Sequence, residues 1–242
     1  MSGDGCVVVV TGAAGGIGAA SVAALLARGA RVVATDARGD QLAALGKHPG
    51  LSPRELDVTS PAQVREVAEW VVREHGRVDA LVNAAGVFAR TPATALDEGV
   101  MRRILAVNLE GALRCTSVLG ARMADRGSGR IVHLASVSAG AGAALASVYA
   151  ASKAGLIAAA RSAARELGPR GVRVNVVAPG LIDTEMLAPD RELARQFVVP
   201  RIPAGRLGTA DEVAEMIAYL VTSAPDYLTG SVITLDGGLS VG

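Results

Sequence analysis

The segment CVVVVTGAAGGIG, residues 6–18, constrains the fold of this chain more than any other stretch of its sequence. Its four valines predict a buried strand, and four glycines follow within seven positions. Glycine weakens both strands and helices, so a cluster of this kind belongs where bare backbone is needed. The segment therefore predicts a strand, a tight turn and the start of a helix.

Short apolar runs alternate with longer amphipathic segments along the rest of the chain. This alternation is typical of βαβ units with a parallel sheet. The strands, rich in Val, Ile, Leu and Ala, are those of a sheet covered on both faces. Strands are expected at Cys6–Thr11, Arg31–Asp36, Leu51–Asp57, Ala80–Asn83, Gly129–Ala135, Arg173–Ala178 and Ser231–Leu235, and helices at Ile17–Arg28, Gln41–Leu45, Pro61–His75, Val100–Arg126, Tyr149–Leu167 and Ala210–Thr222.

We therefore expect an α/β fold, a single-domain, Rossmann-type, doubly wound parallel sheet of about seven strands with helices on both faces. One segment fits the alternation poorly. It is Leu181–Leu207, which carries prolines at 189, 200 and 203 and follows a strand. Its position is that of a lid over a substrate.

Composition narrows the classes of partner. The 242 residues are 50% hydrophobic and only 2% aromatic, and the formal net charge is +1. Few rings and no basic run argue against nucleic acid. No apolar run reaches the roughly 18 residues of a membrane span, and the N-terminal MSGDGC has no signal pattern. We expect a cytoplasmic protein in which Cys6 and Cys115 are buried free thiols.

The glycines are spaced to admit a phosphate group. Gly12, Gly16 and Gly18 read G-x3-G-x-G, which differs from the G-x-G-x-x-G dinucleotide fingerprint. A purely structural turn is the alternative. Asp36 ends the next strand, where a carboxylate can bind a ribose diol and repel a 2′-phosphate, which favours NAD over NADP. Arg38 tempers this preference, because a guanidinium pairs with phosphate.

A second cluster carries acid–base chemistry. Tyr149 and Lys153 are spaced i and i+4, which places them on one helix face. A nearby ammonium is expected to lower the pKa of the phenol, so that it exchanges a proton with a substrate oxygen. Ser136 follows a strand and can hold that oxygen, with Ser138 as its competitor. Either serine can instead bond the loop backbone.

These motifs resemble the short-chain dehydrogenase/reductase family over essentially the whole length. The resemblance divides the domain 1–242 into a dinucleotide-binding half of about 1–130 and a catalytic half of about 131–242, with a mobile lid at about 183–207. The matching motifs are TGAAGGIG (11–18), LDV (56–58), NAAG (83–86), VNL (107–109), Ser136, YAASK (149–153), VNVVAPGLIDTEM (174–186) and DGG (236–238).

The resemblance implies roles for the residues. Tyr149 is the acid/base, Lys153 tunes it, Ser136 orients the substrate and Asn108 keeps a water in the proton relay. The substrate is expected at Ser136, Ser138, Tyr149 and Gly180. The nicotinamide cofactor, NAD(H) in preference to NADP(H), is expected at Gly12, Ala14, Gly16, Ile17, Gly18, Asp36, Ala37, Asp57, Val58, Asn83, Ala84, Ala85, Gly86, Tyr149, Lys153, Pro179, Gly180, Ile182 and Thr184.

Two of these expectations have further support or an alternative. Where the family uses NADPH, a basic residue usually stands at the position of Gly15, so this glycine agrees with Asp36. Asp57, assigned to the adenine edge, also reads as an ordinary turn and helix cap in DVTSPAQV.

Within the family, the chain looks most like the 3-oxoacyl-ACP reductases. Arg130 and Arg170 match positions that contact the acidic acyl carrier protein, although a solvated arginine is the simpler interpretation. Arg90 is either a substrate anchor or solvated. Since Asp36 favours NAD, a dihydrodiol or other secondary-alcohol dehydrogenase is the alternative, and a non-catalytic dinucleotide-binding protein is a third.

The remaining expectations concern assembly and metals. The resemblance predicts a homotetramer built on Val100–Arg126, Tyr149–Leu167 and the C-terminal strand region. His48, His75 and His133 are scattered without ligand spacing, so no metal site is expected.

Overall fold

The computed structural model describes residues 5–241. Residues 1–4 and 242 lie outside the described part. They comprise the first four residues of MSGDGC, in which no targeting signal is expected, and the two ends of the predicted domain 1–242.

Seven parallel strands form one sheet in the order β3-β2-β1-β4-β5-β6-β7. After β3 the chain crosses to the other half of the sheet, so that the strand order reverses between β1 and β4. At such a point a doubly wound sheet opens a crevice at its carboxyl edge. The expected fold class is therefore confirmed. The strands are β1 (Val7–Thr11), β2 (Arg31–Asp36), β3 (Leu51–Glu55), β4 (Ala80–Asn83), β5 (Gly129–Leu134), β6 (Val172–Pro179) and β7 (Val232–Leu235).

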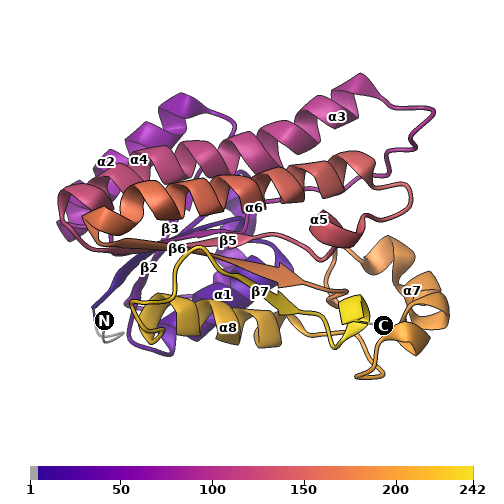
Figure 1. Ribbon diagram of the computed structural model, residues 1–242. Coiled ribbons are helices and arrows are strands. Elements are labelled where there is room, and N and C mark those ends of the chain that lie inside the picture. Colours follow the sequence, from indigo (N-terminus) through magenta and orange to yellow (C-terminus); the bar gives the residue numbers. More distant parts are fainter. Residues whose placement is uncertain (1–4, 242) are drawn as a thin grey trace.

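Helices cover both faces of the sheet (Figure 1). One face carries α1 (Gly16–Leu26) and α8 (Ala210–Thr222), and the other carries α2 (Pro61–His75), α4 (Ala112–Asp125) and α6 (Ser147–Leu167). Successive valines of β1 alternate between the two cores. Val7 and Val9 pack on the α2 side, and Val8 and Val10 pack on the α1 side. This double burial explains the unbroken apolar run.

The helix expected at Val100–Arg126 is a continuous helical stretch with an irregular centre. It consists of α3 (Glu98–Leu105), one π-helical turn at Ala106–Gly111, and α4. Wide turns of this kind are frequent at functional sites, and this one contains Asn108. The helix expected at Gln41–Leu45 is instead a 3₁₀ segment, Gly39–Leu45, since a single short turn there connects β2 and β3.

Short helices lie at the end of the molecule near the C-terminus (Figure 1). They are α5 (Ser138–Ala141) and α7 (Arg191–Phe197). The latter belongs to the predicted lid, 183–207, and explains why that segment breaks the strand–helix alternation. The other 3₁₀ turns are Gly168–Arg170, Ala188–Asp190, Val199–Arg201 and Leu239–Val241.

By length and composition alone, the stretch Glu98–Asp125 passes the test for a membrane span. The sequence reasoning missed it because charged residues interrupt its apolar runs. In the structure 44% of its most apolar 18-residue stretch is buried, and α4 packs against the sheet through Cys115, Leu119 and Met123. These contacts are those of a core helix.

Both cysteines are free and buried, as expected. Burial raises the pKa of the Cys6 thiol to about 11 and that of the Cys115 thiol to about 12.

Arg130 departs from the expectation that it is solvated or docks a carrier. It is only 4% exposed, and its guanidinium donates to the Leu220 carbonyl at 3.1 Å and to Asp226 at 2.8 Å. These bonds tie β5 to the end of α8. Its side chain therefore connects elements that are distant in sequence. Arg170 is half-exposed and pairs with Asp125 at 2.9 Å.

Asp79 gives a test of the packing at the amino ends of the strands. It is 2% exposed, accepts from the Val7 amide at 2.8 Å, and pairs with Arg77 and Arg126, each at 2.9 Å. Because Asp79→Ala leaves a buried amide unpaired and separates two cations from their anion, we expect a loss of roughly 2–3 kcal/mol in the free energy of unfolding.

Asp125→Ala is the matched control, since it breaks the exposed pair with Arg170, and we expect a loss below about 1 kcal/mol. Urea denaturation followed by circular dichroism measures both variants. Equal losses in the two would contradict the structural role of Asp79.

Candidate active site

The glycine loop is built so that backbone packs directly on backbone. Gly12 has a φ of +68°, and a Cβ added there would lie 2.6 Å from the Cα of Ala85. A Cβ on Gly18 would overlap the carbonyl oxygen of Gly12. Side chains at these two positions would separate the turn from β4 and from α1. The spacing G-x3-G-x-G is thus the condition for this turn.

The turn presents the start of α1 to the carboxyl edge of the sheet. Gly15 is the N-cap residue and provides no side-chain hydrogen bond, so no side chain caps the first amides of the helix. An uncapped helix start with little side-chain bulk suits an anionic group such as a diphosphate. The loop therefore fits the dinucleotide that its sequence predicts. Ala14 belongs to this loop, and Ile17 belongs to the first turn of α1.

Asp36 ends β2 beside this loop. Its side chain is 8% exposed, and its carboxylate accepts from the Ala14 amide at 3.1 Å and from the Arg38 amide at 3.0 Å. The Arg38 guanidinium adds a contact at 3.3 Å. One lone pair of Oδ2 stays available for a hydroxyl group. Ala37, which follows, is exposed.

Asp57 uses one carboxylate oxygen to form a turn. That oxygen accepts from both the amide and the hydroxyl of Thr59 at 2.8 Å. The side chain of Ser60 then caps α2 by accepting from Gln63. The predicted turn thus uses one of the two carboxylate oxygens of Asp57. The contact of Asp57 with adenine stays a prediction. Val58 is buried.

The residues after β4 lie beside both predicted clusters. Asn83 pairs in register with Thr11 of β1, and the Ala85 amide donates to the Thr11 hydroxyl at 3.2 Å. A Cβ on Gly86 would lie 3.5 Å from the Nζ of Lys153. The motif Asn83–Gly86, which includes Ala84, therefore connects the glycine loop with the acid–base cluster.

The end of β6 completes the edge. Gly180, which follows Pro179, donates to the Leu235 carbonyl at 2.9 Å, and a Cβ there would lie 2.8 Å from Asp236. Ile182 pairs with Gly208 through bonds that use the carbonyl of Leu181 and the amide of Asp183. This pattern directs the N–H and C=O of Ile182 itself away from Gly208.

Thr184 reaches the glycine loop from the lid segment. A Cβ on Gly16 would lie 2.8 Å from the Cγ2 of Thr184. The first residues after β6 are therefore in contact with the start of α1, although they are distant in sequence.

Tyr149 and Lys153 both belong to α6, with the Nζ of Lys153 5.7 Å from the centre of the phenol ring. The ammonium donates to the carbonyl of Leu134 at 2.7 Å, and Lys153 is 3% exposed. Ser136 stands two residues beyond that carbonyl. The strand end and the helix thus hold the three predicted residues together.

Burial sets the protonation of this cluster in the free protein. It lowers the pKa of Lys153 to about 8. It raises the pKa of Tyr149, and hydrogen bonding from Ser136 acts in the opposite direction. The expected lowering of the phenol pKa by Lys153 is therefore wrong for the free protein. The ammonium is bonded to Leu134 and lies over the ring, and desolvation of the phenolate dominates.

Asn108 lies in the π-helical turn and is fully buried. Its side-chain oxygen accepts from the Val87 amide at 2.8 Å, and its side-chain nitrogen donates to the Val87 carbonyl at 2.9 Å and to Ser152 at 3.3 Å. Asn108 thus joins the loop after β4 to α6 through its side chain. The predicted role in holding a water stays a prediction.

His133 is a buried neighbour of Lys153 that the sequence reasoning did not single out. It is 1% exposed, and its Nδ1 lies 3.2 Å from the Nδ2 of Asn83. Because an amide nitrogen donates, Nδ1 accepts and the imidazole is neutral. Burial, reinforced by the charge of Lys153, lowers its pKa to about 4. Only its position directly before Leu134 in the strand could have signalled this contact.

An exposed aromatic side chain packs against Tyr149, and the loop before α6 carries a second exposed apolar residue. The ring of Phe88 meets the phenol edge-on, with 5.2 Å between the centroids, and Phe88 is 38% exposed. Leu145 is 48% exposed and has a φ of +59°, which is unusual for a residue other than glycine. Its carbonyl accepts from the Thr91 amide at 2.7 Å. This bond joins the loop after β4 to the loop before α6.

Arg90 pairs with Asp190 of the lid segment. Its side chain is 56% exposed, which agrees with the solvated interpretation, and its anchoring of a substrate stays a prediction. The pair links the loop after β4 to the 3₁₀ turn that precedes α7.

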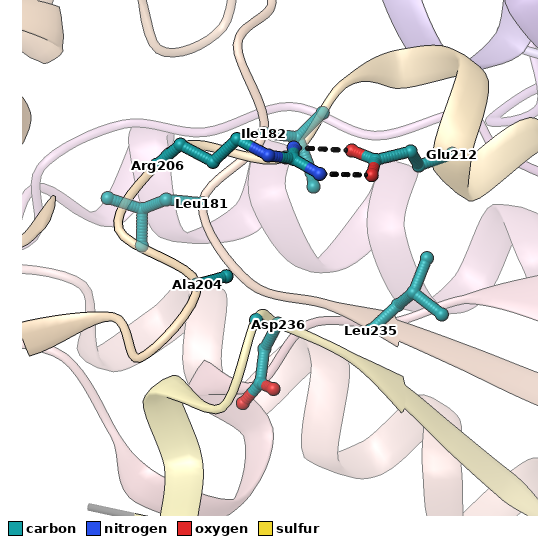
Figure 2. Close-up of a pocket in the computed structure, with 9 residues that line it drawn as sticks. Leu181, Ile182, Ala204, Arg206, Glu212, Leu235 and Asp236 are labelled. Atoms are coloured by element: carbon teal, nitrogen blue, oxygen red, sulfur yellow. Dashed lines mark hydrogen bonds and ion pairs between the residues drawn. The ribbon is translucent and has the colours of Figure 1, made fainter.

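The two ends of the lid segment meet at its base. A cavity of about 90 Å³ lies there between Leu181, Ala204 and Asp236, and its lining includes none of Ser136, Tyr149 or Lys153 (Figure 2). Arg206 closes one side through two bonds to Glu212, at 2.6 and 2.9 Å.

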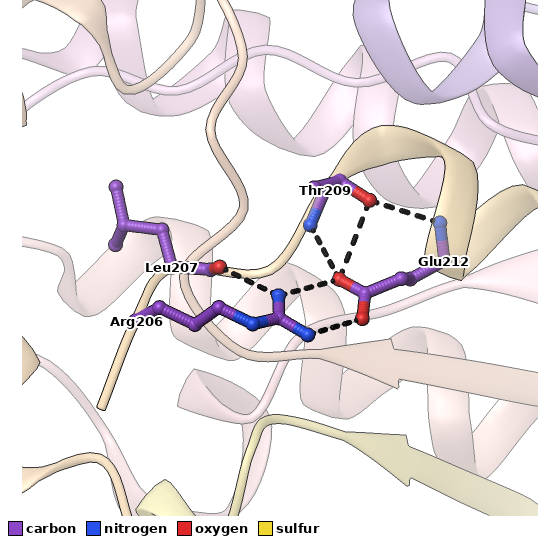
Figure 3. A network of polar contacts seen from close by, with 4 residues as sticks. All are labelled: Arg206, Leu207, Thr209 and Glu212. Atoms are coloured by element: carbon purple, nitrogen blue, oxygen red, sulfur yellow. Dashed lines mark hydrogen bonds and ion pairs between the residues drawn. The ribbon is translucent and has the colours of Figure 1, made fainter. Parts of the chain in front are cut away.

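Figure 3 shows how these bonds connect with the capping box of α8, in which Thr209 and Glu212 bond each other's backbone. The Arg206 guanidinium and the Thr209 amide lower the pKa of Glu212 to about 2. The base of the predicted lid segment is thereby attached to the start of α8.

Comparison with known proteins identifies the family. A family model described as "Enoyl-(Acyl carrier protein) reductase" matches residues 12–240. The chain belongs to the short-chain dehydrogenase/reductases. As a member of this family it is an oxidoreductase that uses a nicotinamide dinucleotide, which agrees with the glycine loop and the Tyr149–Lys153 pair.

Two curated members of the family are each 40% identical to the chain. One is the 3-oxoacyl-[acyl-carrier-protein] reductase FabG of Thermotoga maritima, with 98% of this chain and 99% of the relative covered. The other is cis-4-hydroxycyclohexanecarboxylate dehydrogenase of Sinomonas cyclohexanicum, with 96% and 95% covered. A solved structure, a gluconate 5-dehydrogenase of Burkholderia cenocepacia in complex with NADP and tartrate, is 28% identical with a TM-score of 0.94, covering 99% of this chain and 96% of that one.

The buried neutral His133 is expected to make the free energy of unfolding of this protein depend on pH in the acid range. Its folded-state pKa of about 4 lies below the ordinary value of 6.5. Stability from the neutral imidazole is therefore complete above pH 6.5 and is lost as the pH falls toward 4, by up to about 3 kcal/mol. His133→Asn removes this dependence.

The measurement is the free energy of unfolding of both proteins between pH 7 and 4, with the exposed His48→Asn as the control. Parallel curves for wild type and His133→Asn would contradict the neutral imidazole.

Proposed function

We propose that this chain reduces 3-oxoacyl thioesters to 3-hydroxyacyl thioesters, with NADH preferred as the reductant. The observation that carries the proposal is the approach to Tyr149. Phe88 packs against the phenol and is exposed, Leu145 is exposed four residues before Tyr149, and residues 137–148 contain no charged side chain. Such a site suits an uncharged acyl chain. The 40% identity to the Thermotoga maritima reductase supports the same substrate class.

In the proposed reaction the bound nicotinamide supplies a hydride to the carbonyl carbon. Tyr149 donates its phenolic proton to the carbonyl oxygen, which becomes the hydroxyl of the product. Ser136 donates a hydrogen bond to that oxygen, where negative charge develops. The raised pKa of free Tyr149 keeps the phenol protonated, as an acid for reduction requires. Lys153 offers positive charge beside the phenolate that remains.

The assignment of NAD rests on Asp36. Its carboxylate ends β2 beside the glycine loop and is bonded to the amide of Ala14. A 2′-phosphate at the same place would meet this negative charge, whereas a ribose hydroxyl finds an acceptor. Arg38 acts in the opposite sense, and the Burkholderia cenocepacia structure contains NADP. The preference is therefore set by the balance of Asp36 and Arg38.

A second candidate is the oxidation of a secondary alcohol with NAD, as in a dihydrodiol or cyclic-alcohol dehydrogenase. Asp36 favours it, because NAD-linked sites suit oxidation. The Sinomonas cyclohexanicum relative, named for such a substrate, supports it at the same 40% identity.

We place the protein in the cytoplasm as a homotetramer. Leu113 on α4 is 39% exposed, and an interface along α4 and α6 would cover it. Docking of an acyl carrier protein, with Arg130 buried, would depend on Arg170 and its neighbours.

Tyr149→Phe tests the proposed reaction. Because the acid is lost while the ring is kept, kcat for an acetoacetyl thioester is expected to fall at least 10²-fold. The assay follows the loss of NADH absorbance, and NADH affinity measured by calorimetry is the control. A variant that keeps the wild-type kcat would contradict the proposed mechanism. Wild-type protein that binds NADH but reduces no 3-oxoacyl thioester would favour the second candidate.

Asp36→Ala tests the cofactor assignment. Removal of the charged acceptor is expected to lower kcat/KM with NADH by about 10- to 100-fold, the range for a hydrogen bond to a charged group. Use of NADPH is expected to improve. Arg38→Ala is the paired variant and should lower kcat/KM with NADPH alone. If wild type already prefers NADPH, the assignment to NAD is wrong.

A further inference from the structure

The hydroxyl groups of Ser136 and Ser138 form a directed pair at the end of β5. The Oγ of Ser138 donates to the Oγ of Ser136 at 3.0 Å, and the Ser138 amide donates to the same oxygen at 3.2 Å. Ser138 is 9% exposed and begins α5. The sequence allowed both serines to contact the substrate, but the structure gives them different surroundings.

We propose that Ser138 is a positioning residue that makes the Ser136 hydroxyl a hydrogen-bond donor to the substrate oxygen. This inference rests on the proposed carbonyl and alcohol chemistry of the site. It reassigns Ser138 from a residue that touches the substrate to one that acts through Ser136.

The hydrogen-bonding capacity of the Ser136 hydroxyl determines its role. A hydroxyl oxygen has two lone pairs and carries one proton. Ser138 fills both lone pairs of Ser136 with its amide and its hydroxyl. The proton of Ser136 is then the one group left to offer a third partner. In the free protein the phenol of Tyr149 is near enough for hydrogen bonding from Ser136 to lower its pKa.

The backbone around Ser138 fixes this direction. The Ala139 amide donates to the Ser136 carbonyl at 3.0 Å, and the Gly142 amide donates to the Ser138 carbonyl at 2.9 Å. The turn therefore holds the amide of Ser138 against Ser136, and the Ser138 hydroxyl supplies the second bond. Of these two bonds, only the one from the side chain can be removed by substitution.

The bond from the Ser138 hydroxyl to Ser136 stabilises the transition state more than it stabilises the bound substrate. Negative charge develops on the substrate oxygen during reduction, and a donor that is itself hydrogen-bonded is a stronger donor. Loss of the Ser138 hydroxyl should therefore lower kcat and leave KM nearly unchanged. It should also weaken the bond from Ser136 to Tyr149, which stabilises the phenolate.

Ser138→Ala is the first variant. We expect kcat to fall ~10-fold, less than the 10²- to 10³-fold seen when a direct oxyanion donor is removed. A matched pair, Ser138→Thr and Ser138→Val, keeps one shape and differs in the hydroxyl, and it replaces the alanine variant if that protein does not fold. Threonine is expected to restore kcat and valine is not. Ser147→Ala, which removes a loop bond to the Thr91 carbonyl, is the control for general loosening.

The second readout needs neither substrate nor cofactor. Ultraviolet titration of the free protein, with Tyr149→Phe subtracted, follows the ionisation of Tyr149. Ser138→Ala is expected to raise this apparent pKa by ~0.5 unit or more, with recovery in the threonine variant.

An unchanged titration together with an unchanged kcat would overturn the proposal, as would equal effects of threonine and valine. If wild type turns over no 3-oxoacyl thioester, the proposed substrate fails, and the titration still decides the role of Ser138.

Discussion

The hydrogen bond from the Lys153 ammonium to the Leu134 carbonyl connects the two parts of this site. It joins α6 to the end of β5, and it is the polar contact that accommodates a nearly fully buried cation. Since Tyr149 lies one helical turn before Lys153 and Ser136 lies two residues after Leu134, this bond brings the phenol and the serine to the same place. Burial at this point also determines the protonation of Lys153, Tyr149 and His133.

The parallel sheet makes such a meeting possible. Its strands end at one edge, where three segments that are distant in sequence come together. They are the glycine loop after β1, Asp36 at the end of β2 and the segment after β4. Asn108 and Thr91 then attach the loop after β4 to α6 and to the loop before it. The site is therefore held by polar bonds between loops, on a scaffold whose own stability comes from the two apolar cores.

Much of this arrangement could be predicted from sequence, because its causes are local. The unbroken apolar runs predict the strands, and the glycine spacing predicts the turn whose backbone packs on Ala85. The features that were missed depend on distant partners. Arg130 is buried because Asp226 and the end of α8 meet it, and the pKa of the phenol rises because other elements cover it. No local pattern carries that information, and the π-helical turn at Asn108 is equally invisible in composition.

The proposed reaction depends on direct transfer of hydrogen between a cofactor and a carbonyl carbon beside Tyr149. The most direct measurement is the reduction of an acetoacetyl thioester with NADH deuterated at the transferable position, followed by mass spectrometry of the product. The account predicts one deuterium on the carbinol carbon, and in D₂O with ordinary NADH it predicts none from solvent on that carbon. Absence of deuterium in the first product, or its incorporation at that carbon from D₂O, would contradict the account.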